Sequence, residues 1–408
     1  MKAVILAAGI GKRMESNQAK PLLKLFGIPI IEHTIRKLRG YDIIVVYHKK
    51  EIEEFIKKKF PHIKLIYNNE PERENGWSLY LAKDYVKEDF ILLMADHFYG
   101  EKFFNFNKKD KTTLFVSKYC SNAIEATKVK VRGNKIVNIG KSLDDYDFFD
   151  TGFFYCKKEI FDYIDEKKEK IKLSDIIFNL AKEGEIKYEV IDDFWIDIDT
   201  KEELKKAEKL LQKKIVKETD GIVSRNINRK ISTKITKYIA KYDFITPNLI
   251  AFLSFLIALF SAFLFYIKEF ILAAIIAQIS SIFDGCDGEI ARIKNMKTKF
   301  GGFFDSILDR YADIFIVSGM LFSYNNYNFL TIIAFILALI GCILPSYAYH
   351  ITKLRLPFFG RDVRLFLIMI GGILAHFNIK FIFYTLFFIG IITNFGVILL
   401  IIMGHKVL

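Results

Sequence analysis

Hydrophobic and polar positions divide the chain into two parts near residue 246. Before this point, short apolar runs such as AVILAA at 3–8 and FILLM at 90–94 alternate with charged stretches. Alternating short strands and helices predict an α/β domain with a Rossmann-like open sheet, whose site lies at the C-terminal ends of the strands. Beyond this point Phe, Ile and Leu dominate. That part of the chain is expected to be an all-α membrane domain.

A helix needs about 20 mostly apolar residues to cross a membrane. Six stretches of the second part approach this requirement, so we expect six transmembrane helices. An even number places both ends of the domain on one side of the membrane. The second stretch is short but continues as a helix through DGCDGEIAR. The expected spans are 248–267, 270–283, 300–324, 329–351, 364–376 and 381–403.

The net charge of +13 is concentrated just before the first expected span. Isoleucines recur there at four- or five-residue steps, at positions 222, 227, 231, 235 and 239. Both features favour an amphipathic helix on an anionic membrane surface over a solvated linker, and they argue against nucleic-acid binding. Basic residues also mark the cytoplasmic side, which would place the N-terminal domain and the C-terminus in the cytoplasm. The basic residues are Lys213, Lys214, Lys217, Arg225, Arg229, Lys230, Lys234, Lys237 and Lys241.

These patterns predict three segments: a domain at 1–205, a basic amphipathic linker at 206–246 and a membrane domain at 247–408. The four cysteines have no paired spacing, which indicates a reduced interior without disulfides or a zinc cluster. The start of the chain runs directly into a predicted strand, so no secretory signal is expected. Scarce Gln with abundant Lys, Glu and Ile is typical of heat-adapted proteins, and also of AT-rich genomes.

Four aspartates lie at the edge of the apolar region. Asp284 and Asp287 share one helical face, and Asp305 and Asp309 share a face of the next helix. A charge at membrane depth costs about 2.5–3.5 kcal/mol, so it normally faces a protein-lined site. Converging carboxylates need cations to remain ionised, and hard oxygen ligands favour Mg²⁺ or Mn²⁺. The alternative is a polar cytoplasmic loop.

The stretch that contains these aspartates reads D-x-x-D-G-x-x-A-R-x8-G-x3-D-x3-D without departure. It resembles the motif of the CDP-alcohol phosphotransferase family, and the resemblance covers about residues 220–408. It implies six membrane helices, a homodimer, Mg²⁺ or Mn²⁺, and transfer of a phosphoalcohol from a CDP-alcohol to a second alcohol with release of CMP. Asp309 would also be the general base for the attacking hydroxyl. The implied metal ligands are Asp284, Asp287, Asp305 and Asp309, and the implied nucleotide contacts are Gly288, Ala291, Arg292 and Gly301.

Cations near the ends of the later spans suit a phosphorylated acceptor. Arg361 in GRDVRLF, with Arg364 and Lys353 nearby, could hold such a phosphate. The same residues equally suit topology-setting anchors at the membrane edge.

The N-terminal part begins with a strand that runs into a glycine loop, AVILAAGIGKRM at 3–14. Successive backbone N–H groups of such a loop can cradle phosphates, and neighbouring cations add charge. With KPLLKLFGIPII at 20–31, the loop resembles the sugar-nucleotidyltransferase signature, over about residues 1–205. Lys20 would then stabilise charge at the α-phosphorus of the nucleotide. The loop residues expected to bind the nucleotide are Gly9, Gly11, Lys12 and Arg13.

Later landmarks extend this resemblance. Asp96 follows the strand FILLM, where this fold places a metal-binding aspartate, and Asp197 and Asp199 in WIDIDTKEEL would supply further metal contacts. Lys128 and Lys141 would bind the sugar phosphate. ENGWSLYLAKDY at 74–85 resembles the base-recognition region, and DTGFFYC at 150–156 the sugar-binding strand. His97 either contacts substrate or packs.

The fusion resembles the family of bifunctional inositol-1-phosphate cytidylyltransferases and di-myo-inositol-phosphate phosphate synthases of heat-adapted microbes. The resemblance implies that CTP and inositol 1-phosphate give CDP-inositol, which then reacts with a second inositol 1-phosphate in osmolyte synthesis. One alternative is a phospholipid synthase with an inactive or regulatory N-terminal domain. A transporter is disfavoured, because the aspartates cluster at one membrane edge.

Overall fold

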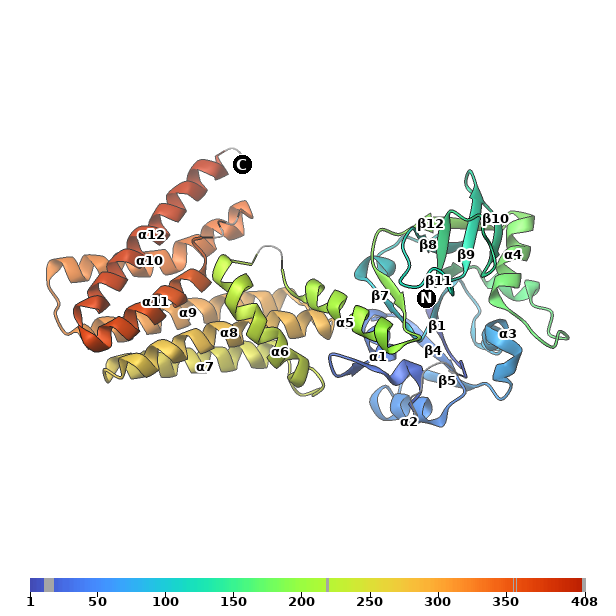
Figure 1. The fold of residues 1–408 in the computed structure, drawn as a ribbon, viewed down its shortest axis with the longest axis horizontal. Coiled ribbons are helices and arrows are strands. Elements are labelled where there is room, and N and C mark those ends of the chain that lie inside the picture. The colour runs from blue at the N-terminus through green and yellow to red at the C-terminus, as the bar shows by residue number, and fades with distance from the viewer. Residues whose placement is uncertain (11–17, 218–219, 355, 357, 406–408) are drawn as a thin grey trace. The chain divides into compact units, whose positions relative to one another are not determined.

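The computed structural model describes residues 1–10, 18–217, 220–354, 356 and 358–405. The chain forms two compact units, Met1–Leu210 and Leu211–Leu408 (Figure 1). The first unit is an α/β fold and the second is helical, so the predicted fold classes are confirmed.

A mixed sheet of nine strands, counted over the described residues, organises the first unit. Four strands in the order β6-β1-β4-β5 are parallel, and β11 joins β6 in the antiparallel direction. This is the open sheet that the alternating pattern predicts. The strands are β1 Lys2–Ala7, β4 Asp42–Tyr47, β5 Lys64–Tyr67, β6 Phe90–Met94, β8 Thr112–Ser117, β9 Lys128–Arg132, β10 Lys135–Gly140, β11 Phe148–Cys156 and β12 Ile186–Val190.

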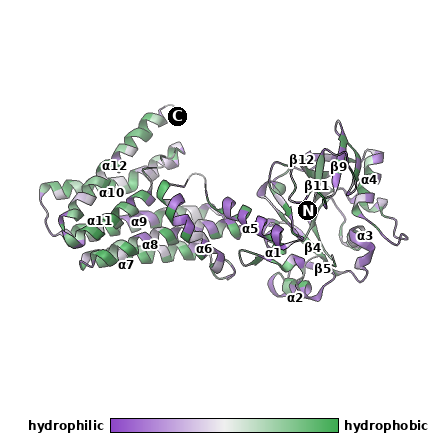
Figure 2. Ribbon diagram, viewed as in Figure 1, coloured by the Kyte–Doolittle hydropathy of each residue, from purple (hydrophilic) through white to green (hydrophobic). Residues whose placement is uncertain are grey.

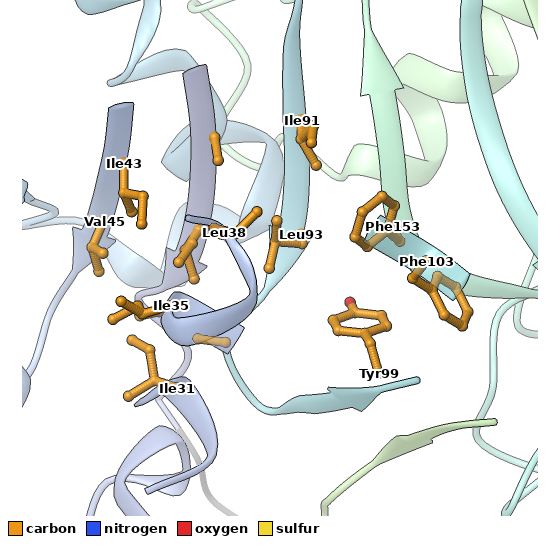
Figure 3. Packing of buried hydrophobic residues seen from close by; sticks show 14 of the residues in the cluster. Ile31, Ile35, Leu38, Ile43, Val45, Ile91, Leu93, Tyr99, Phe103 and Phe153 are labelled. Carbon is orange, nitrogen blue, oxygen red and sulfur yellow. The ribbon is translucent and has the colours of Figure 1, made fainter. Parts of the chain in front are cut away.

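Apolar cores cover both faces of this sheet, because successive residues of a strand point to opposite sides. Ala3 and Ile5 of β1 belong to one core, and Val4 and Leu6 belong to the other. Figure 3 shows Ile31, Ile35 and Leu38, from α1 and the residue after it, packed near Val45 and Leu93 of the sheet. The helices of this unit are α1 Ile30–Lys37, α2 Lys50–Lys59, α3 Glu74–Tyr80, α4 Leu173–Glu183 and α5 Lys201–Ile215.

Two small antiparallel pairs lie beside the main sheet. β2 Lys24–Leu25 pairs with β3 Ile28–Pro29 directly after the short 3-10 helix Lys20–Leu22. β7 His97–Tyr99 pairs with β13 Trp195–Asp197, which places residues nearly 100 positions apart side by side. The second pair matters most for function, since it places Asp197 of β13 opposite His97, the residue after Asp96.

In the described part of the second unit, six long helices form most of the structure, and Figure 2 shows that they are predominantly hydrophobic. Four of them, among the described residues, are long and apolar enough to cross a membrane: α7, α8, α10 and α12. α11 has 17 residues, and α9 carries three aspartates, so six spans remain a prediction. The bounds are α7 Pro247–Tyr266, α8 Phe270–Ile293, α9 Lys299–Tyr324, α10 Phe329–Thr352, α11 Arg361–Phe377 and α12 Lys380–Gly404.

The basic segment before α7 forms a π-helical turn, Ser224–Asn228, followed by α6 Arg229–Ile239. Its buried face is polar and includes Ser232, Thr233 and Thr236, while Ile227 and Ile231 are exposed. This arrangement is the reverse of an ordinary surface helix, whose apolar side is buried. Contact with a membrane surface, which the isoleucine pattern predicts, stays a prediction.

Candidate active sites

The first acidic group lies where β6 ends and where the β7–β13 pair begins. Asp96 follows β6, His97 starts β7, and Asp197 ends β13 directly opposite His97. His97 Nε2 lies 3.5 Å from Asp197 Oδ1 and 4.0 Å from Asp96 Oδ1. One donor atom from each residue lies within 4.8 Å of the others, so the three side chains could hold a metal ion.

Electrostatics in this group favour an added cation. Burial raises the pKa of Asp96, and the neighbouring Asp197 carboxylate raises it further. Burial alone would lower the pKa of His97, but the two aspartates outweigh it and raise that pKa to about 9. For Asp197 the charge of His97 outweighs burial, and its pKa is lowered. Two hard carboxylates that already attract positive charge fit a divalent metal ion.

The orientation of the His97 ring is set by a hydrogen bond at Nδ1, the nitrogen that faces away from the aspartates. Its Nδ1–H donates to the carbonyl oxygen of Thr151 at 2.9 Å. Gly152 has a φ of +68°, and a Cβ at this position would lie 2.8 Å from the His97 ring. Glycine is therefore required both for the backbone conformation and for the approach of the imidazole. The sequence left the role of His97 open, whereas the structure places its Nε2 among the carboxylates.

Lys20 and Asp199 form a separate ion pair at the same end of the unit. Lys20 begins the short helix after the glycine loop, and its ammonium group contacts the Asp199 carboxylate. Asp199 itself is fixed, because its backbone N–H donates to Glu203, which closes a capping box at the start of α5. Of the three predicted ligands in this unit, the described structure brings Asp96 and Asp197 together with His97, and joins Asp199 to Lys20 instead.

The other predicted residues of this unit lie at different places. The charge of Lys141, just after β10, acts on Asp197, whereas the Lys128 ammonium lies 5.1 Å from the centre of the Tyr146 ring. Gly9 follows β1, and no atom of the described residues lies within 4 Å of where its Cβ would be. Gly11, Lys12 and Arg13 lie outside the described residues.

The second acidic group lies between α8 and α9. Asp284 on α8 and Asp305 and Asp309 on α9 each offer a carboxylate oxygen within 4.8 Å of the others, so they too could hold a metal ion. Three hard oxygen donors in one place suit a divalent ion. Asp287 accepts a hydrogen bond from the Gly288 backbone, and its carboxylate also interacts with Asp305. The four signature aspartates are therefore brought together.

Arg361 lies inside this acidic group. Its Nη1 is 3.1 Å from Asp284 Oδ2 and 2.6 Å from Asp309 Oδ1, and its Nε donates to Asp313 at 2.9 Å. Arg364 donates to the other oxygen of Asp313 at 2.6 Å. The predicted phosphate-binding arginine is thus adjacent to the predicted metal ligands and to the general base.

The other predicted nucleotide contacts lie on the same two helices as the aspartates. The Arg292 guanidinium lies over the Cα of Gly288, 3.2 Å from where a Cβ would be. Its Nε and Nη2 are buried and have no partner among the described residues, which leaves donors for a phosphate. Gly301 lies in the first turn of α9, where its N–H donates to Thr298 at 2.9 Å. Ala291 is half-buried on α8 between these features.

Sequence reasoning missed Glu289, which follows Gly288 in the signature and is completely buried. Its carboxylate is held by Arg229, Ser232 and Thr236, which all precede the first span. A charged residue inside a helix that otherwise reads as a membrane span was the available signal.

The comparisons with known proteins agree with this two-part construction. Residues 244–402 match the CDP-alcohol phosphatidyltransferase family, and residues 3–101 match the MobA-like NTP transferase domain. Together with the four apolar helices, the first match identifies a membrane protein. Among solved structures, an inositol-1-phosphate CTP transferase from T. maritima is 25% identical, with a TM-score of 0.48 over 51% of this chain and 94% of that one.

Curated relatives match nearly the whole chain. A "Bifunctional IPC transferase and DIPP synthase" from Aquifex aeolicus is 39% identical over 99% of this chain and 98% of its own length. Proteins of the same name from Thermococcus kodakarensis and Archaeoglobus fulgidus are 36% and 34% identical, over 98% and 96% of this chain and 96% and 82% of their own lengths. The chain therefore belongs to the family of bifunctional IPC transferase and DIPP synthases.

Proposed function

We propose that this protein makes CDP-inositol from CTP and inositol 1-phosphate, and then transfers phosphoinositol from CDP-inositol to a second inositol 1-phosphate with release of CMP. The observation that carries the proposal is similarity to the bifunctional relatives across both units. Among the described residues, each unit contains an acidic group that could hold a metal ion. The product, a phosphorylated di-inositol phosphodiester, would serve osmolyte synthesis.

In the first reaction, a phosphate oxygen of inositol 1-phosphate attacks the α-phosphorus of CTP, and pyrophosphate leaves. Asp96 and Asp197 would hold Mg²⁺, or Mn²⁺, with His97 and Asp199 at their side. Such an ion neutralises the phosphate charge. Lys20 would stabilise the charge that develops at the α-phosphorus, with Asp199 fixing the position of its ammonium group.

The remaining contacts of this first site follow from the resemblance. The loop residues Gly9, Gly11, Lys12 and Arg13 would cradle the triphosphate of CTP. Lys128 and Lys141 would bind the phosphate of the inositol substrate.

In the second reaction, a hydroxyl of inositol 1-phosphate attacks the inositol-bearing phosphorus of CDP-inositol. The new P–O bond forms as the bond to CMP breaks. Asp309 would take the hydroxyl proton. Asp284, Asp287, Asp305 and Asp309 would hold the metal ions, which neutralise charge on the CMP leaving group.

The donor and acceptor phosphates have separate candidate partners in the second site. The unpaired N–H groups of Arg292 suit the diphosphate of CDP-inositol, beside Gly288, Ala291 and Gly301. Arg361 lies next to Asp309, where the phosphate of the acceptor could draw its guanidinium.

The cellular setting belongs to the same proposal. The chain would cross the cell membrane six times, with the N-terminal unit and the C-terminus in the cytoplasm and the basic α6 segment on anionic lipid. A nucleotidyltransferase domain would span 1–205, a linker 206–246 and the membrane domain 247–408. The membrane domain would form a homodimer.

A second candidate is a phospholipid synthase with a regulatory N-terminal unit. The phosphatidyltransferase description of the family matched by residues 244–402 favours it. The grouping of Asp96, His97 and Asp197 next to the Lys20–Asp199 pair argues against a decayed first site.

Phosphorus NMR of the purified full-length protein in detergent tests the proposal. With CTP, inositol 1-phosphate and Mg²⁺, we expect a CDP-inositol diphosphate resonance that gives way to a phosphodiester as CMP accumulates. Unchanged CTP would refute the first reaction. Consumption of CDP-diacylglycerol but not of CDP-inositol would establish the phospholipid synthase instead.

A further inference from the structure

The turn of α8 that carries Asp284 and Asp287 is braced from outside by α6. Arg229, the first residue of α6, donates through Nη1 to the carbonyl oxygen of Gly285 at 2.7 Å. Gly285 directly follows Asp284 and lies two positions before Asp287. The same nitrogen contacts Glu289 Oε1 at 2.9 Å, one turn further along α8. A single guanidinium therefore spans the segment that carries both carboxylates.

Glu289 is the residue of α8 to which most of these α6 side chains bind. Its side chain is completely buried, and each of its oxygens accepts a hydroxyl from α6: Ser232 at 2.6 Å and Thr236 at 2.7 Å. A buried carboxylate is tolerated only when it is paired and hydrogen-bonded. The polar face of α6 supplies all of these partners, which explains why that face is turned inward.

The brace has a second anchor at the start of the α6 segment. Arg229 Nε donates to Asp220 at 2.7 Å, and the Ser224 backbone N–H donates to Asp362 of α11 at 2.8 Å. The segment is thus tied at both ends to helices of the acidic site. Arg229, with charged partners on both sides, has little freedom to move.

The absence of a side chain at Gly285 allows Arg229 to approach α8. A Cβ at this position would lie 2.6 Å from Arg229 Nη1, which is too close for a guanidinium held by three partners. Alanine is otherwise preferred over glycine inside a helix. Glycine here therefore favours the approach of Arg229 at the expense of helix propensity.

From these contacts we infer that Glu289, Arg229 and Gly285 are positioning residues for the metal-binding aspartates of the second reaction: they hold α6 against α8 and fix where Asp284 and Asp287 point. The inference rests on the proposed function for the identity of the site. Loss of a residue that orients metal ligands through hydrogen bonds typically lowers metal affinity or activity by about 10–100-fold.

Metal binding itself provides a test that does not depend on the substrates. Mn²⁺ binding to the full-length protein is followed by electron paramagnetic resonance, in an Asp96→Asn/Asp197→Asn background that silences the first site. Glu289→Gln and Gly285→Ala are expected to weaken Mn²⁺ binding by about 10–100-fold. They should also raise, by a similar factor, the Mg²⁺ concentration for half-maximal CMP release from CDP-inositol.

Two comparisons separate positioning from a loss of stability. Gly285→Ala should change the thermal melting of the helices, followed by circular dichroism, only slightly, because the gain in helix propensity offsets the disturbed contacts of Arg229. Ser261→Ala removes one buried hydrogen bond, to the Ala273 carbonyl at 2.8 Å, elsewhere between α7 and α8. This control should bind Mn²⁺ normally. Thr236→Val, which removes one donor to Glu289, replaces Glu289→Gln if that variant fails to fold.

Wild-type Mn²⁺ affinity in Gly285→Ala and in the Glu289 or Thr236 variant would overturn the inference. So would weakened binding that appears only in variants with lowered melting temperatures, since that result would show a structural role alone. If the parent protein binds Mn²⁺ but does not consume CDP-inositol, the proposed substrate is wrong while the positioning inference remains testable through the Mn²⁺ isotherms.

Discussion

The ammonium group of Lys20 and the carboxylate of Asp199 meet across 179 positions of the chain. Both side chains are about 13% exposed, so solvent screens the pair only partly. The pair joins the end of the glycine loop to the strand end that carries Asp197. It makes Asp199 a partner of the proposed catalytic lysine.

The first prediction concerns this pair. Lys20→Met should lower kcat for CDP-inositol formation by about 10²–10³, because a preorganised positive charge at the α-phosphorus is lost. Asp199→Asn should lower it less, since the lysine remains but is less well oriented. Steady-state kinetics of pyrophosphate release provides the measurement. An Asp199→Asn loss larger than that of Lys20→Met would indicate direct metal binding by Asp199.

Asp96→Asn separates the two reactions. The change removes a carboxylate from the first acidic group, and we expect CTP consumption to fall by about 10³ or more. CDP-inositol supplied from outside should still be converted, with CMP released at the wild-type rate. Phosphorus NMR of both reactions in one sample measures this. Loss of both activities in a folded variant would contradict independent sites.

Asp309→Asn gives the reciprocal result. An amide cannot accept the hydroxyl proton, so the second reaction should slow by about 10²–10⁴. CDP-inositol should then accumulate from CTP and inositol 1-phosphate at an undiminished rate. Chromatography of the nucleotides over time measures the accumulation of CDP-inositol. Continued phosphodiester formation near the wild-type rate would assign the general base elsewhere.

We expect Asp150 to make the stability of the first unit depend on pH. Burial raises the pKa of Asp150 from 3.8 to about 6, despite a hydrogen bond from the Gly152 N–H. A raised pKa means that the folded state binds the proton more tightly than the unfolded chain. Protonated Asp150 therefore favours the folded state relative to ionised Asp150. This contribution to the free energy of unfolding is fully present below about pH 3.8 and is lost as the pH rises through about 6. Above that range Asp150 destabilises the fold.

Asp150→Asn should therefore be more stable than the wild type at pH 8, by roughly 1–2 kcal/mol after allowance for residual exposure. The advantage should disappear toward pH 4. Both tryptophans, Trp77 and Trp195, lie in the first unit, so thermal unfolding followed by tryptophan fluorescence in EDTA reports on this unit. An equal stability difference at both pH values would show that Asp150 does not titrate in this range.

The sequence predicted the elements that depend on local patterns. The apolar runs gave all six long helices to within a few residues, because length and composition determine such helices. The signature spacing placed Asp284 and Asp287 on one face and Asp305 and Asp309 on the next. The fold class of the first unit followed from alternating strands and helices.

Contacts between distant segments were beyond prediction. The pairing of β7 with β13, which puts Asp197 opposite His97, depends on how the chain returns to the sheet edge. For the same reason the contact between Asp199 and Lys20 could not be predicted from spacing, and a metal-binding role for Asp199 stays a prediction. The role of Glu289 could not be predicted either, because its partners on α6 are more than 50 positions away in the chain.

The inward polar face of α6 also bears on how the protein is made. Glu289 alone on a hydrophobic α8 would resist entry into the bilayer, at a cost of about 2.5–3.5 kcal/mol or more. Its partners Arg229, Ser232 and Thr236 precede α8 in the chain, so the ribosome completes them before Glu289 is synthesised. The hydrogen-bond donors for the Glu289 carboxylate are therefore already made when α8 emerges, and the order of translation matches the order in which the second site can be assembled.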